Sequence, residues 1–179
     1  MREIYFVTGN KNKFAEALAV IPSLCQLDID LPEIQEIDPK LVISSKLQEA
    51  LGHKKSGLIV EDTALYLDCL NGFPGPLIKW LRKTIGNEGI FNLAYKMGNV
   101  GAEAKTMIGY AENEKEIRYF EGTLRGEIVF PRGDTNFGWD PIFQPAGHEK
   151  TFAEMAPELK NSLSMRRKAF EELKKHLAF

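Results

Sequence analysis

The chain has 179 residues, of which 44% are hydrophobic and 27% charged, proportions that are typical of a soluble globular protein. This length predicts a single domain, residues 1–179. The formal net charge is −2, so no overall positive field draws the protein to nucleic acid or to anionic lipid. No apolar run approaches the ~20 residues of a membrane span, and no signal peptide pattern opens the chain. We therefore expect a cytoplasmic protein with neither a membrane nor a nucleic acid as partner.

The first predicted unit is a strand, a turn and a helix. Residues 3–8 predict a central strand, residues 9–13 a turn, and residues 14–20 a helix with apolar side chains at helical spacing. Unpaired amides at a helix start attract anions, and the lysines of this turn add full charges. The turn is thus a candidate phosphate site. It is not a P-loop, however, and strand–turn–helix units are common without any phosphate.

A second strand is predicted over residues 24–30, and a second helix follows it. Asp38 is the expected N-cap of this helix, Pro39 its first residue, and Gly52 its end. Lys46 lies on the helix, where a solvated lysine is the plain alternative to a ligand-binding one.

Residues 58–60 form a short apolar run that leads directly into Glu61, Asp62 and Thr63. The run predicts a buried strand, with both carboxylates at its carboxyl end, where open α/β sheets bind their ligands. Two adjacent acids at such a position can hold a divalent cation or position a water. The alternative is that Glu61 is solvated and Asp62 caps the turn.

The middle of the chain predicts helices and a hairpin. Two glycines and two prolines within residues 71–76 indicate an irregular loop, with Pro76 in the first turn of a helix that Gly86 breaks. A further helix covers residues 88–97. Residues 104–111 and 116–130 alternate as two long strands around a turn at 112–115, so we expect a mixed rather than a purely parallel sheet.

The last third combines aromatic and basic residues. An aromatic residue beside a glycine, as in residues 137–140, can present a flat face to a planar ligand or simply line the core. From Pro157 onward the pattern is helical, with an interruption near Asn161. Lys160 and Arg166 lie toward the front of this region. An anionic ligand nearby would offset their unfavourable interaction with the helix dipole, and solvated side chains are the alternative.

Four segments of the chain, in this order, resemble the signatures of the inosine triphosphate pyrophosphatase family, also called the Ham1 family. They are Thr8-Gly9-Asn10-x-x-Lys13, then 60–63 with 71–76, then 137–141 with 150–155, and finally Lys160-Asn161 with Ser164-x-Arg166. Together they extend over essentially the whole chain. The expected fold is α/β, with a long twisted mixed sheet flanked by helices and a nucleotide cleft between two lobes.

The resemblance also implies an activity. The family cleaves ITP, dITP and XTP to the monophosphate and pyrophosphate, requires Mg²⁺, acts as a homodimer and cleanses the nucleotide pool. By the same resemblance Glu33 and Asp62 are the expected metal ligands, and Asp62 and Lys13 the expected catalytic residues. The substrate-binding residues that it implies are Thr8, Gly9, Asn10, Lys11, Asn12, Lys13, Lys46, Asp62, Thr63, Phe137, Gly138, Trp139, Asp140, Lys160, Met165 and Arg166.

One position departs from the family pattern. The family usually has Ser-His-Arg in its last motif, whereas this chain has Ser164-Met165-Arg166. Methionine supplies neither the donor nor the acceptor of an imidazole, so we expect weaker discrimination against GTP and ATP. Two other functions fit the same residues: a pyrophosphatase for another modified nucleotide, and a nucleotide-binding protein without turnover.

Overall fold

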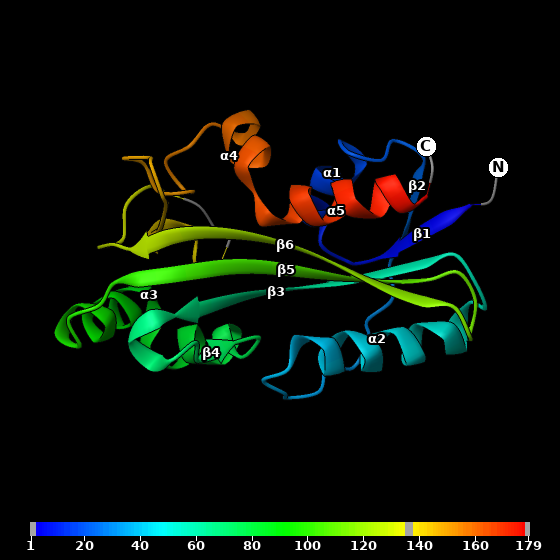
Figure 1. Ribbon diagram of the computed structural model, residues 1–179, viewed down its shortest axis with the longest axis horizontal. Helices are drawn as coiled ribbons and strands as arrows, with labels where there is room; N and C mark the ends of the chain where they lie inside the picture. The colour runs from blue at the N-terminus through cyan, green and yellow to red at the C-terminus, as the bar shows by residue number, and fades with distance from the viewer. Residues whose placement is uncertain (1–2, 135–137, 178–179) are drawn as a thin grey trace.

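The computed structural model describes residues 3–134 and 138–177, which form an elongated α/β molecule (Figure 1). The described residues contain a seven-stranded mixed sheet of order β2-β1-β3-β5-β6-β7, with β4 paired to β3. The strands are β1 (Ile4–Val7), β2 (Leu24–Leu27), β3 (Leu58–Leu67), β4 (Pro74–Gly75), β5 (Gly101–Ala111), β6 (Ile117–Ile128) and β7 (Phe143–Pro145). The α-helices are α1 (Lys11–Leu18), α2 (Pro39–His53), α3 (Ile78–Lys96), α4 (Pro157–Leu163) and α5 (Met165–His176), and short 3₁₀ helices cover Asp68–Leu70 and Asp140–Ile142.

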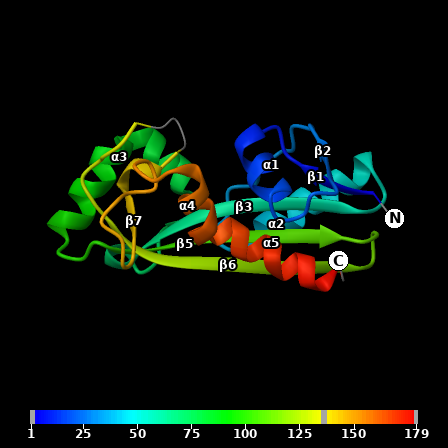
Figure 2. The same ribbon diagram turned by 90° about the horizontal axis from the view of Figure 1, so that it is seen from above.

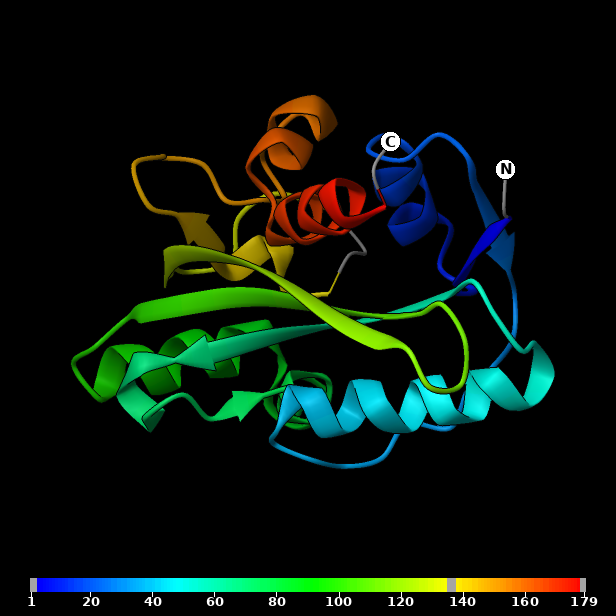
Figure 3. The ribbon, with the colours of Figure 1, turned by 45° about the vertical axis from the view of Figure 1, so that its right-hand side comes forward.

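The helices cover both faces of the sheet. α1, α4 and α5 lie on one face, and α2 and α3 lie on the other (Figures 1 and 3). The long strands β3, β5 and β6 connect an end built from β1, β2 and α1 to an end built from α3 and β7 (Figure 2). This arrangement confirms the predicted mixed sheet, its flanking helices and the β5–β6 hairpin. In the described part of the chain no helix has the length and apolarity that crossing a bilayer requires.

Most predicted boundaries shift by a few residues. Asp38 caps α2 as expected, its side chain accepting a hydrogen bond from the Lys40 amide, but the helix continues one residue past Gly52. α3 begins after Pro76 rather than on it, and Gly86 interrupts it with φ 70°. The break near the C-terminus falls at Ser164, whose side chain caps α5, and not near Asn161.

Two predictions about the sheet were wrong. β1 is internal but not central, because only β2 lies outside it. More importantly, Glu61 and Asp62 do not end their strand: β3 continues to Leu67. The reason is a non-local one, since all ten residues of β3 pair with β5 on one edge, and this antiparallel ladder extends the strand through its polar segment.

The opposite edge of β3 contains a gap. There β1 pairs only with Leu58 and Ile59, and β4 pairs only with Leu65 and Tyr66. Within the described residues, 60–64 therefore have no strand partner on this side. We call this segment the β3 notch. It lies just beyond the carboxyl end of β1, so the ligand crevice expected of a parallel strand is present, at β1 instead of β3.

Helix α5 packs closely on the β5–β6 hairpin. Ala169, Phe170 and Leu173 form its buried stripe, and the Phe170 ring meets the edge of Phe6 at a centroid distance of 5.3 Å. Close approach depends on Gly122 of β6, where a Cβ atom would come within 2.1 Å of the Met165 carbonyl oxygen. This contact fixes the start of α5 over the sheet.

We expect Gly122→Ala to lower the free energy of unfolding by about 1–3 kcal/mol, because the added methyl group meets backbone and not a movable side-chain end. Chemical denaturation measures this change. Gly52→Ala is the matched control: no atom lies within 4 Å of the new Cβ, and replacing an exposed helical glycine stabilises by about 0.5–1 kcal/mol. Equal stabilities of the two variants would contradict the close packing of α5 on β6.

Candidate active site

The site begins in the turn between β1 and α1. Asn10 is the N-cap of α1, and its side-chain oxygen accepts hydrogen bonds from the amides of Asn12 (3.0 Å) and Lys13 (3.1 Å). These two amides were expected to be open to an anion, so the structure corrects that expectation. What remains for an anion is the positive end of the helix together with the Lys13 ammonium.

The side chain of Glu61 is fully enclosed by basic groups. Its Oε2 accepts a hydrogen bond from Arg166 Nε (2.9 Å), and its Oε1 lies 2.5 Å from Lys13 Nζ. Arg166, only 1% exposed, also donates to Glu16 Oε2 (2.6 Å) and to Thr63 Oγ1 (3.0 Å). Burial alone would raise the pKa of Glu61, but the charges of Arg166 and Lys13 lower it to about 2. Glu61 is thus a buried anion and not a solvated side chain.

Asp62 belongs to a second cluster. Lys46 Nζ lies 3.2 Å from Asp62 Oδ1 and 2.6 Å from Glu33 Oε2, and it donates a longer hydrogen bond of 3.4 Å to the Glu61 carbonyl oxygen. Burial raises the pKa of Asp62. At Glu33 burial also acts to raise the pKa, but the charge and hydrogen bond of Lys46 together with the charges of Lys79 and Lys13 outweigh it and lower the pKa. Asp62 Oδ2 is buried without a hydrogen-bond partner. Lys46 is accordingly neither solvated nor free, and Asp62 caps no turn.

The two clusters meet at the β3 notch. Successive side chains of a strand point to opposite faces, so Glu61 faces α5 and Asp62 faces α2. Because no neighbouring strand pairs with the notch on this edge, side chains from both faces of the sheet can approach it near the carboxyl end of β1. A cavity of about 140 Å³ there is lined by Thr8, Lys13, Glu33, Lys46 and Glu61, among others. The lysine from the start of the chain and the acids from its middle therefore share one site.

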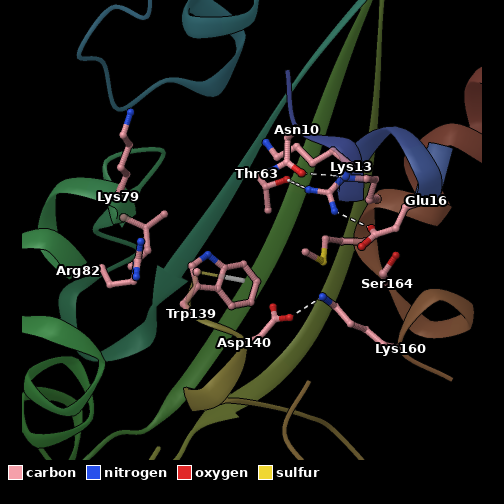
Figure 4. Close-up of a pocket in the computed structure, with 14 residues that line it drawn as sticks. Asn10, Lys13, Glu16, Thr63, Lys79, Arg82, Trp139, Asp140, Lys160 and Ser164 are labelled. Carbon is pink, nitrogen blue, oxygen red and sulfur yellow. Dashed lines mark hydrogen bonds and ion pairs between the residues drawn. The ribbon is translucent and has the colours of Figure 1, made fainter. Parts of the chain in front are cut away.

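A larger cavity of about 330 Å³ adjoins this site (Figure 4). Figure 4 shows Lys79 and Arg82 extending from α3 on one side of it, and Asn10, Lys13 and Glu16 on the other. The described lining contains five basic side chains and two acidic ones: Lys13, Lys79, Arg82, Lys160 and Arg166 against Glu16 and Asp140. This is a positively charged pocket of the size of a small-molecule site.

The far end of the larger cavity is formed by the 3₁₀ turn and the start of α5. Lys160 Nζ donates to Asp140 Oδ2 at 2.5 Å, and burial raises the pKa of Asp140 against the effect of that lysine. Trp139 is 8% exposed, because its ring packs against Phe143 in the core. Trp139 is thus a core residue that also lines the cavity. Met165 is 3% exposed and lies there too.

The residues at the notch also fit a divalent cation. Carboxylate oxygens are the ligands that Mg²⁺ prefers, and Mg²⁺ is usually bound by one or two carboxylates together with substrate phosphates. Asp62 Oδ2 is an unpartnered buried anion oxygen, and the Lys46 ammonium already lies between Asp62 and Glu33 as a cation would. Within the described ranges, no three His, Cys, Asp or Glu side chains converge as a complete metal site. A cation held by the two carboxylates of Asp62 and Glu33 and by substrate oxygens would need no third protein carboxylate, so it is compatible with that finding.

The comparison with known proteins agrees with this geometry. The model of the Ham1 family matches residues 4–176, nearly the whole chain. The chain belongs to the Ham1 family. Two relatives named inosine triphosphate pyrophosphatase, from Candida glabrata and Saccharomyces cerevisiae, are 43% and 40% identical to this Ham1-family protein. Each match covers 98% of this chain, and 97% and 95% of the respective relative.

Solved structures show the same Ham1 fold. The Ham1 protein of Staphylococcus aureus superposes with a TM-score of 0.80 at 27% identity, over 99% of this chain and 98% of that one. A protein of Mycobacterium abscessus titled nucleoside-triphosphatase / dITP/XTP pyrophosphatase superposes with a TM-score of 0.74 at 26% identity, over 96% and 98% of the two chains.

The structure brings together most of the predicted site residues of this Ham1-family protein. Those that line the notch or the larger cavity are Thr8, Asn10, Lys13, Glu33, Lys46, Thr63, Gly138, Trp139, Asp140, Lys160, Met165 and Arg166. Asp62 contacts Lys46 beside the notch, and Asn12 lines a neighbouring cavity. Gly9 lies in the turn after β1, and Lys11 is exposed at the start of α1. Phe137 lies outside the described residues.

Sequence analysis missed three charged residues that line the larger cavity: Glu16, Lys79 and Arg82. A signal was available for the last two. They lie three apart on the helix that follows the Gly- and Pro-rich loop, and this spacing places them on one face. Glu16 gave no local signal, because only the packing of α1 on α5 brings it to Arg166.

Proposed function

We propose that this protein hydrolyses non-standard purine nucleoside triphosphates, such as ITP, dITP and XTP, to the monophosphate and pyrophosphate, and so cleanses the nucleotide pool. One observation carries the proposal: Lys13, Lys46 and Glu33 line a single opening at the β3 notch, with Asp62 paired to Lys46 beside it, at the edge of a larger basic cavity. The names of the relatives, inosine triphosphate pyrophosphatase and dITP/XTP pyrophosphatase, support the same substrate class.

The basic side chains bind the triphosphate. A nucleoside triphosphate carries about four negative charges, which favourably placed cations stabilise as more charge develops on the departing pyrophosphate. Lys13 at the start of α1 and Lys46 on α2 approach the notch from the two faces of the sheet. Lys79 extends toward it from α3, since its charge contributes to the lowered pKa of Glu33. Polyphosphate oxygens at the notch therefore meet cations from three helices.

The three carboxylates at the notch have different roles. Glu61 has its Oε2 bonded to Arg166 and its Oε1 paired with Lys13, so it is held as a fixed charge. Asp62 Oδ2 has no hydrogen-bond partner and is the oxygen available to accept a proton from the attacking water. Glu33 and Asp62 would hold Mg²⁺. When bound, this ion neutralises phosphate oxygens and lowers the pKa of water.

The test is direct. Purified protein is incubated with ITP and Mg²⁺, and the products are identified by chromatography together with a pyrophosphate assay. Monophosphate and pyrophosphate in equal amounts, lost on addition of EDTA and restored by Mg²⁺, are the expected result. Binding of ITP without product would instead indicate a nucleotide-binding protein. Faster hydrolysis of modified pyrimidine triphosphates than of ITP or XTP would indicate the other pyrophosphatase.

Met165 offers a test of base selectivity. We expect Met165→His to increase the preference for ITP over GTP, measured as the ratio of kcat/KM values, by about 2- to 10-fold. This is the effect of one additional neutral hydrogen bond at the edge of the base. The side chain lines the larger cavity, so the imidazole reaches a bound nucleotide. An unchanged ITP to GTP ratio in a variant with the wild-type melting temperature would count against this role.

We also propose that the protein is a homodimer. Phe73 in the loop before α3 and Trp80 on α3 are 47% and 43% exposed, and aromatic side chains are enriched at protein–protein interfaces. Light scattering coupled to size-exclusion chromatography gives the mass directly. A monomer at micromolar concentration would exclude this part of the proposal.

A further inference from the structure

The basic residues of the larger cavity fall into two groups. Lys13, Lys160 and Arg166 each form an ion pair with a carboxylate. Lys79 and Arg82 do not: within residues 3–134 and 138–177 neither has a carboxylate at ion-pair distance. Both line the cavity from α3 (Figure 4). These two cations are therefore available to a ligand without breaking an existing pair.

The two free cations act at different parts of the site. The charge of Lys79 helps to lower the pKa of Glu33 at the notch, whereas Arg82 lines the larger cavity together with Trp139 and Asp140. Further along α3, Asn87 Nδ2 donates a hydrogen bond of 3.2 Å to the Gly138 carbonyl oxygen, which ties this part of the helix to the segment of Trp139. Arg82 lies between Lys79 and Asn87 in the helix. It lines the same cavity as Gly138 and Trp139.

The charged donors at that end of the cavity are already paired. A nucleotide whose phosphates lie at the notch places its base toward Trp139, Asp140 and Met165. Met165 has no hydrogen-bond donor. Lys160 is paired with Asp140, and the Arg166 fork is bound to Glu61, Glu16 and Thr63.

We propose that Arg82 is a specificity-determining residue that donates hydrogen bonds to the 6-oxo edge of the purine. A guanidinium matches the paired O6 and N7 acceptors of a 6-oxopurine, as in arginine recognition of guanine, and finds a donor in place of O6 in a 6-aminopurine. This inference rests on the proposed function and adds the residue that reads the base.

The experiment compares three triphosphates that differ only at position 6: ITP (oxo), ATP (amino) and purine riboside triphosphate (hydrogen). Wild type, Arg82→Leu, Arg82→Gln and Arg82→Lys are assayed for kcat/KM on each. Arg82 is exposed on its helix, so these variants should fold, and their melting temperatures check this. Lys83→Leu is the matched control, because Lys83 is the next residue on α3, lies over the Trp80 ring and does not line the cavity.

We expect Arg82→Leu and Arg82→Gln to lower kcat/KM for ITP about 10- to 100-fold, the discrimination given by one bidentate arginine contact. The value for purine riboside triphosphate should change much less, since that base lacks O6 and keeps only N7 as an acceptor. Arg82→Lys should recover part of the ITP activity. An equal loss on all three substrates would place Arg82 on the phosphates or ribose and overturn the inference, as would no loss at all. Absence of ITP hydrolysis in the wild type would overturn the proposed function instead.

Discussion

Asp62→Asn is expected to lower kcat for ITP at least about 100-fold, because an amide neither accepts the proton of the attacking water nor carries the charge that holds a divalent cation. The variant should remain folded. Burial disfavours the charged form of Asp62 and raises its pKa, so a neutral side chain of the same shape removes an unfavourable buried charge. Loss of turnover with an equal or higher melting temperature is a combination that a purely structural residue would not give.

Asp68→Asn is the control for this variant. Asp68 follows directly after β3, and its carboxylate pairs with Arg125 on the surface, away from both cavities that contain the notch residues. We expect its kcat to equal that of the wild type. If folded Asp62→Asn retains wild-type hydrolysis, Asp62 has no part in the chemistry, and Glu33 becomes the remaining carboxylate to test.

Arg166→Met is expected to lower the free energy of unfolding by about 3–5 kcal/mol. Arg166 and Glu61 are both buried, and removing one partner leaves a buried charge without adequate compensation. The same substitution also removes the hydrogen-bond donors of Glu16 and Thr63, which accept from the other two nitrogens of the guanidinium. The double variant Glu61→Gln with Arg166→Met should recover part of the loss, because it removes both charges of the Arg166–Glu61 pair while Glu16 stays without its arginine. Urea denaturation of the two single variants and the double variant measures this coupling.

The next residue supplies a matched control. Arg167 pairs with Glu171 four residues later, and both side chains are about 40% exposed. Such surface pairs contribute only about 0.3–0.5 kcal/mol, so Arg167→Met should leave stability nearly unchanged. If Arg166→Met proves as stable as Arg167→Met, the buried network does not hold the start of α5 in place.

Local signals in the sequence were sufficient for much of the fold. The cap at Asp38, the strand–turn–helix unit before Leu18 and the alternation of the β5–β6 hairpin all have short-range causes, and the structure confirms them. The extension of β3 through residues 61–63 has no short-range cause. Glu61, Asp62 and Thr63 interrupt the apolar pattern, and only pairing with a strand some 45 residues later keeps this segment extended.

The sequence predicted which residues form the site better than it predicted the contacts between them. The motifs named the acids and lysines that the structure brings to the notch, but no pattern indicates that Glu61 and Asp62 serve opposite faces of the sheet. The burial of Arg166 had one usable signal: it lies four residues before Phe170, on the apolar stripe of α5. A charged residue on such a stripe is buried only if it is paired, and its partners come from distant segments.

The β3 notch is short, and its shortness disfavours aggregation. A bare strand margin invites pairing with extended segments of other molecules, and so favours aggregation. Here the bare margin is closed at one end by β1 and at the other by β4, and it extends over residues 60–64 alone. A foreign strand of ordinary length would collide with both neighbours. The gap that gives a small molecule access to the site is thereby too short to pair with another polypeptide.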